Sequence, residues 1–322
     1  MIKFENVATK YVDESVILAL REYNIEKEKC KYLLDKNFEK ELRGIIEKLF
    51  KNKYGKVAIE NNKIIGYLVF LGPWDGFFGE VRGGFSPLGG SAFGGNDRNK
   101  LASQLFEEVS REMVKDKIFS FAISRYAHDD EVAKSLILNG FGIRCSDAIL
   151  KLKDRKIVDS LNVDYTFKEL KGNKKREIEE MKKKLSRHLL DAPTYFPTNV
   201  NRFNEWFDKE DIRVFIAENN KEIMGYMSLD TEAETFISDS KGIYNICGAY
   251  IDKRYRNKEV AKQLLEYICR VSENEKMTHL GVDCETLNPT ALRFWSKYFD
   301  KYTYSYARRL DERIFGHEKY LR

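Results

Sequence analysis

Proline and cysteine are both scarce in this sequence of 322 residues, with five of each. The cysteines are scattered and contain no Cys-x-x-Cys pair, a distribution that excludes a disulfide framework and a zinc site. They are Cys30, Cys145, Cys247, Cys269 and Cys284. Long apolar runs are also missing, because charged residues interrupt each one, and the first residues show no cationic-then-apolar leader. We therefore predict a cytoplasmic protein with no metal and no membrane contact.

An excess of either charge is missing too. The chain carries 56 basic and 51 acidic residues, a net charge of +5, and the two signs are interspersed. Such a balance gives no sign of the strongly basic surface that a nucleic-acid partner needs. What the chain does contain is 43% hydrophobic and 13% aromatic residues, which predicts a packed globular protein. Its length exceeds one typical domain and fits two domains of about 150 residues each.

A sequence repeat divides the chain into two copies of one unit. Residues 57–71 contain two β-rich runs around an Asn-Asn turn, which predicts a hairpin, and a similar stretch recurs at 214–229. Arg256-Asn-Lys follows Arg98-Asn-Lys by 158 residues. Further matches at 159 residues join Ala102, Gln104, Leu105 and Glu107 to Ala261, Gln263, Leu264 and Glu266. Repetition of several elements at one interval indicates tandem copies of an α/β unit.

The two copies are predicted to form domains at residues 1–152 and 164–322, joined by a polar linker at 153–163. At the start of one helix the first copy is one residue shorter and has no counterpart of Glu259. The first copy also contains six glycines between residues 83 and 95, a run that more often forms a long mobile loop than a phosphate-binding one. We therefore expect the second copy to carry the chemistry.

Residues 246–265 of the second copy read as a strand, a basic turn and a helix. Apolar residues recur at helical spacing from Val260 onward, so the turn before it forms the first, unpaired turn of the helix. Free backbone N–H groups and the helix dipole favour an anion there, and Arg254, Arg256 and Lys258 add positive charge. The stretch predicts a phosphate site, although basic turns are also common as solvated connections.

A second strand and helix follow this element. Alternation along residues 278–285 puts Asp283 and Glu285 on one face of the strand. Asn288 and Pro289 then supply a helix N-cap and a proline for the first helical position. Either carboxylate could serve as a general base or lie as a solvated charge at the strand end.

The second copy resembles the GNAT superfamily of acetyl-CoA-dependent acyltransferases in the order of its elements and in two motifs. These are Arg256-x-x-x-x-Ala261 and Asn288-x-x-Ala291-x-x-Phe294-Trp295-x-x-x-Phe299. The resemblance covers about residues 165–310, and residues 1–152 resemble a degenerate copy. It implies an α/β (α+β) fold of two tandem GNAT-like domains, each with a mixed, mostly antiparallel sheet flanked by helices. This tandem architecture is similar to that of mycothiol synthase.

The resemblance also assigns roles to residues. It implies that acetyl-CoA binds with its pyrophosphate on the turn, its thioester carbonyl against a bulged strand and its pantetheine arm near Asn288. The turn residues are Arg256, Asn257, Lys258, Glu259, Val260 and Ala261, and the strand residues are Ala249, Tyr250 and Ile251. It places the base at Asp283, with Glu285 beside it. The implied partner is a small-molecule amine acceptor, and the protein is expected to be a monomer or a homodimer.

Two positions depart from the family pattern. Glu259 stands where glycine is usual, so its carboxylate must turn away from the phosphates or repel them. Trp295 stands where a tyrosine usually protonates the departing thiolate, which an indole cannot do. Tyr298, one turn on, is the predicted substitute. The alternatives are Tyr302, Tyr304 and Tyr306, whose alternation also predicts a late strand.

Two functions fit these features. The first is an acetyl-CoA-dependent N-acetyltransferase that moves an acetyl group directly to a primary amine of a small molecule. The alternative, favoured by Glu259 and Trp295, is a non-catalytic acyl-CoA-binding or regulatory module. His188 and His279 lack neighbours at ligand spacing and are expected to be ordinary. The loop at residues 191–197 is expected either to line the acceptor pocket or only to connect two helices.

Overall fold

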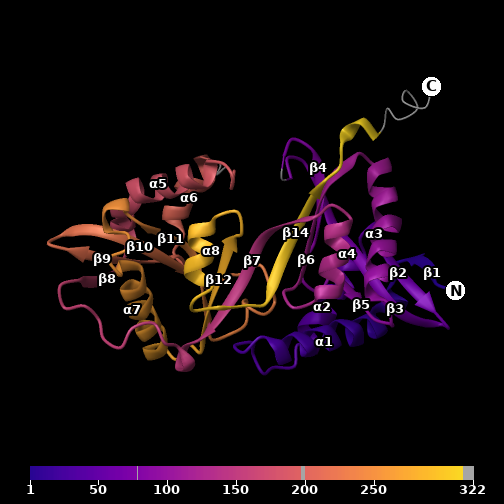
Figure 1. Ribbon diagram of the computed structural model, residues 1–322, viewed down its shortest axis with the longest axis horizontal. Coiled ribbons are helices and arrows are strands. Elements are labelled where there is room, and N and C mark those ends of the chain that lie inside the picture. The colour runs from indigo at the N-terminus through magenta and orange to yellow at the C-terminus, as the bar shows by residue number, and fades with distance from the viewer. Residues whose placement is uncertain (78, 197–199, 315–322) are drawn as a thin grey trace. The chain divides into compact units, whose positions relative to one another are not determined.

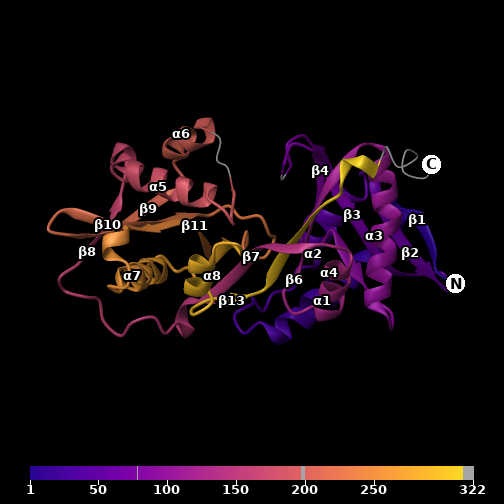
Figure 2. The same ribbon diagram turned by 45° about the horizontal axis from the view of Figure 1, so that its top comes forward.

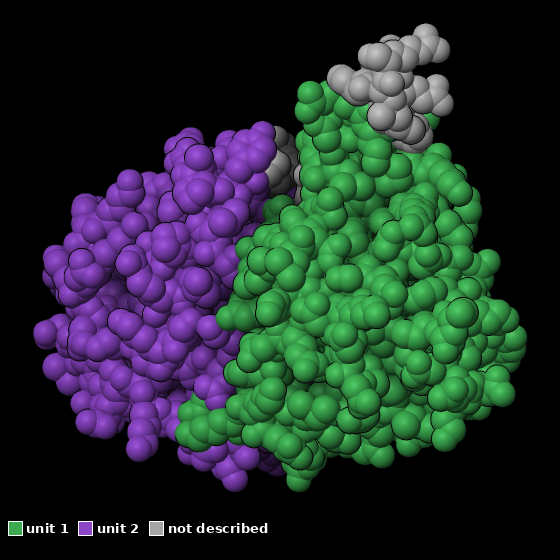
Figure 3. Space-filling view, turned by 45° about the vertical axis from the view of Figure 1, so that its right-hand side comes forward, with its two compact units in different colours: residues 1–146, 302–322 green, residues 147–301 purple. Residues whose placement is uncertain are grey.

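The computed structural model describes residues 1–77, 79–196 and 200–314 of the chain. The chain forms two compact units, coloured separately in Figure 3. One contains residues 1–146 and the chain from residue 302 onward, and the other contains residues 147–301. Each unit is a mixed sheet with helices packed beside it (Figures 1 and 2).

The first unit consists of residues 1–146 and the chain from residue 302 onward. Its helices are α1 (Val12–Lys29), α2 (Glu39–Leu49), α3 (Arg98–Lys115) and α4 (Asp130–Leu138), with a short 3₁₀ turn η1 (Thr9–Tyr11). Its strands are β1 (Lys3–Asn6), β2 (Tyr54–Glu60), β3 (Lys63–Trp74), β4 (Arg82–Ser86), β5 (Ser91–Phe93), β6 (Ile118–Tyr126), the start of β7 (Gly142–Lys151) and β14 (Thr303–Arg309). The strand order is β1-β2-β3-β4-β6-β14-β7, and β5 pairs with β3.

The second unit repeats this order. Its helices are α5 (Glu179–Leu190), α6 (Val200–Asp208), α7 (Val260–Asn274) and α8 (Pro289–Trp295), with 3₁₀ segments η2 (Leu152–Asp154), η3 (Gly172–Ile178) and η4 (Lys253–Tyr255). Its strands are the end of β7, β8 (Thr166–Leu170), β9 (Arg213–Asn219), β10 (Glu222–Asp230), β11 (Ile243–Ile251), β12 (His279–Glu285) and β13 (Asp300–Lys301). The order is β7-β12-β11-β10-β9-β8, with β13 on β7.

The predicted fold class is confirmed by the strand directions. In the described part of the chain, β4 pairs with β6 in parallel in the first unit, and β11 pairs with β12 in parallel in the second. The hairpin pairs β2 with β3 and β9 with β10 are antiparallel, as are most of the other pairs. The parallel pair occupies the corresponding place in both units, so the sequence repeat is also a structural repeat.

Both predicted hairpins are present. In the first, Glu60 pairs with Lys63 across Asn61 and Asn62, whose φ angles are 50° and 62°. Positive φ at both central residues gives a turn whose twist matches that of the flanking strands, and asparagine tolerates this conformation. The hairpin of β9 and β10 also has a two-residue turn with positive φ, at Asn220 and Lys221, because Asn219 still pairs with Glu222.

The glycine-rich stretch between residues 83 and 95 does not form the expected mobile loop, because β4 and β5 run through it. A Cβ atom at Gly83 would lie 2.8 Å from the Ser120 carbonyl oxygen. A Cβ atom at Gly84 would lie 2.9 Å from the Leu71 carbonyl oxygen. Glycine therefore lets β4 fit between β3 and β6, and the prediction of a loop is wrong.

The last strand explains why the compact units differ from the sequence repeat. β14 lies between β6 and β7, pairing Ala307 with Ala122 and with Gly142. The late strand predicted from the alternating tyrosines is thus confirmed, and Tyr306, 1% exposed, packs in the core of the first unit. The predicted bounds of 1–152 and 164–322 follow the repeat, whereas the units follow the sheet in which each strand pairs.

Candidate functional site

Strands β11 and β12 begin as a parallel pair and then part. Ile243–Ile246 pair with His279–Val282. Beyond these residues β11 continues to Ile251 and β12 to Glu285, and no later pair between them occurs in the described chain. Two parting strands leave backbone groups free along a wedge that side chains or a ligand can fill.

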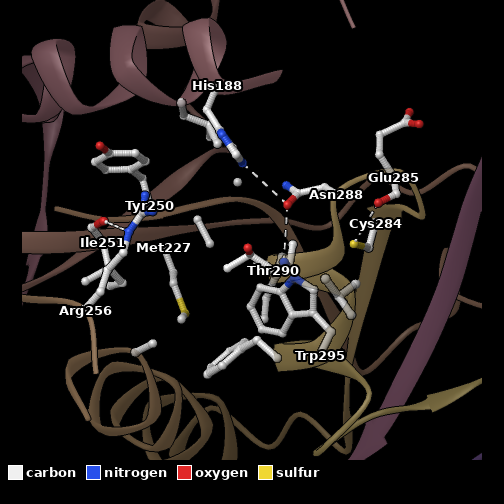
Figure 4. A pocket seen from close by; sticks show the side chains of 18 of the residues that line it. His188, Met227, Tyr250, Ile251, Arg256, Cys284, Glu285, Asn288, Thr290 and Trp295 are labelled. Atoms are coloured by element: carbon white, nitrogen blue, oxygen red, sulfur yellow. Dashed lines mark hydrogen bonds between the residues drawn. The ribbon is translucent and has the colours of Figure 1, made fainter. Parts of the chain in front are cut away.

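A bulge bends β11 at the point of separation. Ser228 of β10 pairs with Gly248, whereas the next residue, Leu229, pairs with Ile246, so Cys247 is an extra residue in β11. A cavity of about 780 Å³ opens in the wedge. Its walls come from β11, β12, the last turns of α5 and the first turns of α7 and α8 (Figure 4).

This cavity brings together nearly all the residues to which the sequence assigns a role. Its lining includes Ala249, Tyr250, Ile251, Arg256, Asn257, Glu259, Val260, Ala261, Asp283, Glu285, Asn288 and Tyr298. Asp283 and Glu285 reach the same cavity, as strand alternation predicts. Lys258 does not line it, and its ammonium lies 5.5 Å from the centroid of the Tyr255 ring.

The start of α7 presents free backbone donors to the cavity. The first helical bond runs from the Gln263 N–H to the Glu259 carbonyl, at 3.0 Å. Among described residues, no acceptor is found for the N–H groups of 257–262, and the Glu259 side chain makes no capping bond. Free N–H groups and the positive end of the helix dipole together favour a bound anion, as expected for a phosphate.

The structure shows how Glu259 is accommodated at a position where glycine is usual. Its φ angle is 62°, in the left-handed region that glycine adopts freely and other residues adopt at a cost. Its carboxylate forms an ion pair with the Lys262 ammonium, which offsets its charge beside the free N–H groups. The turn therefore accommodates glutamate, at the cost of some backbone strain and of an ion pair that engages Lys262.

Replacing Glu259 with glycine is expected to strengthen the binding of a phosphorylated probe, here acetyl-CoA, by about 3- to 10-fold. Glycine removes the strain, deletes a negative charge near the anion site and frees Lys262. Isothermal titration calorimetry of the two proteins measures the change. Glu232→Gln, a change at an exposed glutamate outside the cavity, is the control and should bind as the unchanged protein does. Weaker binding by Glu259→Gly would contradict an anion site at this turn.

Arg256 ties the turn to the end of β11. Its Nε donates to the Ile251 carbonyl at 3.1 Å, and its guanidinium lies 5.5 Å from the centroid of the Tyr250 ring. Arg254 instead forms an ion pair with Asp252 at 3.0 Å and does not line the cavity. Of the three basic residues predicted to serve the phosphate site, Arg256 is therefore the one that the cavity exposes.

The corresponding arginine of the first unit makes the same backbone contact. Arg98 Nε donates to the Phe93 carbonyl at 2.8 Å, as Arg256 Nε does to Ile251. In both copies the acceptor lies five residues before the arginine. The two copies therefore share even this individual hydrogen bond between the arginine and the strand backbone.

The charges around Arg98 nevertheless differ from those around Arg256. The Asp97 carboxylate caps α3 by accepting from the Lys100 N–H at 3.0 Å. The Arg98 guanidinium donates to Asp129 at 2.8 and 2.7 Å and to Glu22 at 3.0 Å. The first unit therefore places its own carboxylates at the helix start that the second unit leaves open.

Asp283 has the electrostatic character of a general base. Its side chain is exposed to the cavity, but the surrounding walls and the charge of Glu234 raise its pKa to about 6. A carboxyl group that titrates near neutral pH is suited to accept a proton in a reaction. The Cys247 side chain is exposed to the cavity, but the walls around it keep water away and raise the pKa of its thiol to about 11. This cysteine therefore remains protonated and is unsuited to act as a nucleophile.

The residue that would protonate a leaving thiolate remains a prediction. Trp295 is 7% exposed and packs edge-on against Phe294 and Phe299, with ring centroids 4.8 and 5.5 Å away. Tyr298 lines the cavity, and burial raises the pKa of its hydroxyl. Its neighbouring charges are Lys262 and Glu259, which belong to the α7 end of the cavity.

His188 is a site residue that the sequence patterns missed. It lines the cavity from the last turn of α5, and its Nε2 lies 3.4 Å from Asn288 Oδ1 (Figure 4). The two residues are 100 positions apart, so no local pattern joins them. In the loop that follows, Phe196 also lines the cavity, which favours the acceptor-wall interpretation, and Pro197 lies outside the described residues.

Two further features concern ions and membranes. In residues 1–77, 79–196 and 200–314, no group of three or more histidine, cysteine, aspartate or glutamate side chains is placed to hold a metal ion. None of the helices described has both the length and the apolar character needed to cross a bilayer.

Comparison with known proteins connects this site to a family. Residues 179–300 match the family model described as Acetyltransferase (GNAT) family. The chain is similar to a GCN5-related N-acetyltransferase from Sphaerobacter thermophilus, with 10% identity and a TM-score of 0.61 over 96% of this chain and 95% of that one. The family match confirms that residues 179–300 resemble the GNAT superfamily, as predicted, and the near full-length likeness confirms the predicted fold.

Two other solved structures are similar, and at such identities the likeness concerns the fold alone. One is the GCN5-related glucosamine N-acetyltransferase region of a fungal multi-domain GH3 β-N-acetylglucosaminidase, with 13% identity and a TM-score of 0.55 over 95% of this chain and 38% of that one. The other is a tandem GNAT protein from the clavulanic acid biosynthesis pathway, with 13% identity and a TM-score of 0.49 over 96% and 98% of the two chains. No curated protein sequence matches this chain.

Proposed function

We propose that this chain, a tandem protein of the GNAT fold, is an acetyl-CoA-dependent N-acetyltransferase whose acceptor is a primary amine of a small molecule. One observation carries the proposal. A single cavity of the second unit holds the free N–H groups of α7 and the Asp283 carboxyl, with the parted strands β11 and β12 as its walls. An anion site and a base in one wedge suit a phosphorylated acyl donor and an amine acceptor.

The chain supplies groups for each part of the donor. The turn at residues 256–261 would hold the diphosphate, the backbone of 249–251 would face the thioester carbonyl, and Asn288 would contact the pantetheine arm. Acetyl-CoA, when bound, supplies an acyl group already activated as a thioester. The protein's task is then mostly orientation, which brings the carbonyl carbon within reach of the acceptor nitrogen.

Proton transfer is assigned to Asp283. An amine reaches the site largely as an ammonium ion, which has no free lone pair. The Asp283 carboxylate accepts a proton from it, and the freed lone pair forms the new C–N bond as the C–S bond breaks. The nitrogen then gives up a second proton, and the departing CoA thiolate takes up one proton and leaves as the thiol. Backbone N–H groups of β11 beside the Cys247 bulge would stabilise the negative charge that develops on the carbonyl oxygen.

A non-catalytic acyl-CoA-binding module is the second candidate. It is favoured by Trp295, which occupies the position of the usual tyrosine and is buried among aromatic rings. Such a module would bind the donor through the same N–H groups but would not transfer the acyl group.

Amine-dependent turnover separates the two candidates. The full chain is mixed with acetyl-CoA and a panel of small primary amines, and acetylated amine is detected by mass spectrometry. This readout avoids the background that a thiol reagent would give with the chain's own exposed Cys247. We expect acetylation of at least one amine. Calorimetric binding of acetyl-CoA with no acetylation of any amine would favour the binding module instead.

The stoichiometry of binding is expected to be one acetyl-CoA per chain. The α7 start is open, whereas the α3 start is capped by Asp97 and its arginine is paired with Glu22 and Asp129. Isothermal titration calorimetry gives the number of sites directly. Two equivalent sites per chain would mean that the first unit also accepts the donor, despite its own carboxylates.

A further inference from the structure

The contact between His188 and Asn288 determines how one amide group faces the cavity. Asn288 is the N-cap residue of α8, and its Oδ1 accepts from the Ala291 N–H at 3.3 Å. His188 Nε2 lies 3.4 Å from the same oxygen (Figure 4). Because a helix-start N–H needs an acceptor, the atom facing Ala291 must be the oxygen of the amide and not its nitrogen.

The proton positions follow from this assignment. The Asn288 oxygen can only accept, so His188 Nε2 must carry the hydrogen and donate it. Two donors now converge on Oδ1, one from Ala291 and one from His188. A flip of the amide would break both bonds at once, so the pair holds Asn288 in one orientation.

The other end of the amide is left without a partner. Within the described part of the chain, the Asn288 NH₂ group has no acceptor, although the residue is 7% exposed and lines the cavity. The Nδ2 atom is accessible from the cavity, so its hydrogens can donate to an acceptor that lies there. A ligand that brings an acceptor oxygen into the cavity would receive this hydrogen bond in place of water.

We infer that His188 is a positioning residue, which acts through Asn288 by holding its Nδ2–H toward the cavity to donate to a carbonyl oxygen of the acyl donor. The inference rests on the proposed function, because it takes the occupant to be an acyl-CoA. Such a ligand has carbonyl oxygens in its pantetheine arm and in its acyl group, and either could accept the bond. His188 itself need not touch the ligand.

Binding of three ligands shows which carbonyl oxygen accepts the bond from Asn288. Acetyl-CoA contains both kinds of carbonyl, CoA contains only the pantetheine amides, and adenosine 3′,5′-bisphosphate contains neither. His188→Leu is expected to weaken acetyl-CoA binding by about 3- to 10-fold and to leave the bisphosphate unchanged. An equal loss for CoA would assign the bond to a pantetheine carbonyl, and a loss for acetyl-CoA alone would assign it to the acyl carbonyl.

Two further variants test the route through Asn288. His188→Gln keeps an N–H donor at about the place of imidazole Nε2 and should retain wild-type affinity. Asn288→Asp can still accept from Ala291 and His188, so α8 stays capped, but it offers no donor to a ligand. If His188 acts only through this amide, adding His188→Leu to Asn288→Asp should cause no further loss of affinity.

The results that would overturn the inference are distinct from failure of the proposed function. Unchanged acetyl-CoA affinity in His188→Leu, or additive losses in the double variant, would remove the positioning role while leaving the donor site intact. Equal weakening of the bisphosphate and of acetyl-CoA would also remove it, because His188 would then act on the whole cavity. If the unaltered chain bound none of the three ligands, the proposed function itself would fall.

Discussion

Replacing Asp283 with asparagine is expected to lower kcat/KM for the acceptor amine by at least about 100-fold at pH 7.5. Asparagine has nearly the same shape but cannot accept a proton as a base. Acetyl-CoA should bind with unchanged affinity, because the free N–H groups and Arg256 that would hold its phosphates are untouched. Steady-state rates with an amine accepted by the wild type, together with calorimetry, measure the two quantities.

The pH dependence of the reaction gives a second test of this residue. The pKa of Asp283 is raised to about 6, first by the cavity walls that keep bulk water from the carboxyl group and then by the charge of Glu234. The base works only when it is deprotonated, so wild-type kcat/KM should rise as the pH increases through about 6 and then level off. Asp283→Asn should lack this limb. Glu234→Gln removes one cause of the shift and should move the limb to lower pH.

Thermal unfolding of Asp283→Asn shows whether a loss of activity comes from the missing base or from an unfolded protein. A carboxyl whose folded pKa lies above the ordinary value of 3.8 has an ionised form that disfavours the folded state once the pH exceeds the folded pKa. Asp283→Asn should therefore unfold at the same or a higher temperature than the wild type at pH 7.5. Glu285→Gln, at the other carboxylate of this strand face, should keep most of the activity. A near wild-type rate in Asp283→Asn would mean that the proton leaves by another route.

Arg256→Glu is expected to weaken acetyl-CoA binding by about 30- to 100-fold. The change replaces a positive charge that lines the cavity with a negative one, beside the N–H groups proposed to hold a diphosphate. Its melting temperature should change little, because the half-buried Arg256 side chain gives up one hydrogen bond to Ile251 and no buried ion pair. Calorimetry and thermal unfolding give both values.

Arg98→Glu is the matched control in the other copy. It would put a third carboxylate beside Glu22 and Asp129, whose side chains are 6% and 7% exposed, and should cost at least about 3 kcal/mol of unfolding free energy. The affinity of the folded molecules for acetyl-CoA should not change. Urea denaturation measures the cost. An equal loss of affinity in both variants, or a loss in neither, would rule out the α7 turn as the phosphate site.

Local patterns were enough to predict the elements that build the site. The α7 helix begins at Val260, Asn288 caps α8, and Asp283 and Glu285 reach one cavity, all as the sequence predicts. Each of these features depends on residues a few positions apart, because strand alternation, helical spacing and capping bonds are set by near neighbours. The 158-residue interval between Arg98 and Arg256 likewise predicted the repeat.

Local patterns could not distinguish the surroundings of similar residues. Arg98 and Arg256 stand in matching motifs, but only Arg98 is paired with Glu22 and Asp129, which lie 76 and 31 residues from it. The glycine-rich stretch was wrongly predicted as a loop, because its role depends on the carbonyl groups of β3 and β6 on either side.

The sequence by itself determined the hairpins, the helix starts and the strand face on which the carboxylates lie, because these depend on the backbone of nearby residues. The tertiary structure decided which helix start stays open to an anion, how strongly Asp283 holds its proton and which histidine reaches Asn288. The reason is physical. Charge interactions, burial and hydrogen bonds act over a few ångströms, and only the folded chain brings residues from distant positions within that range.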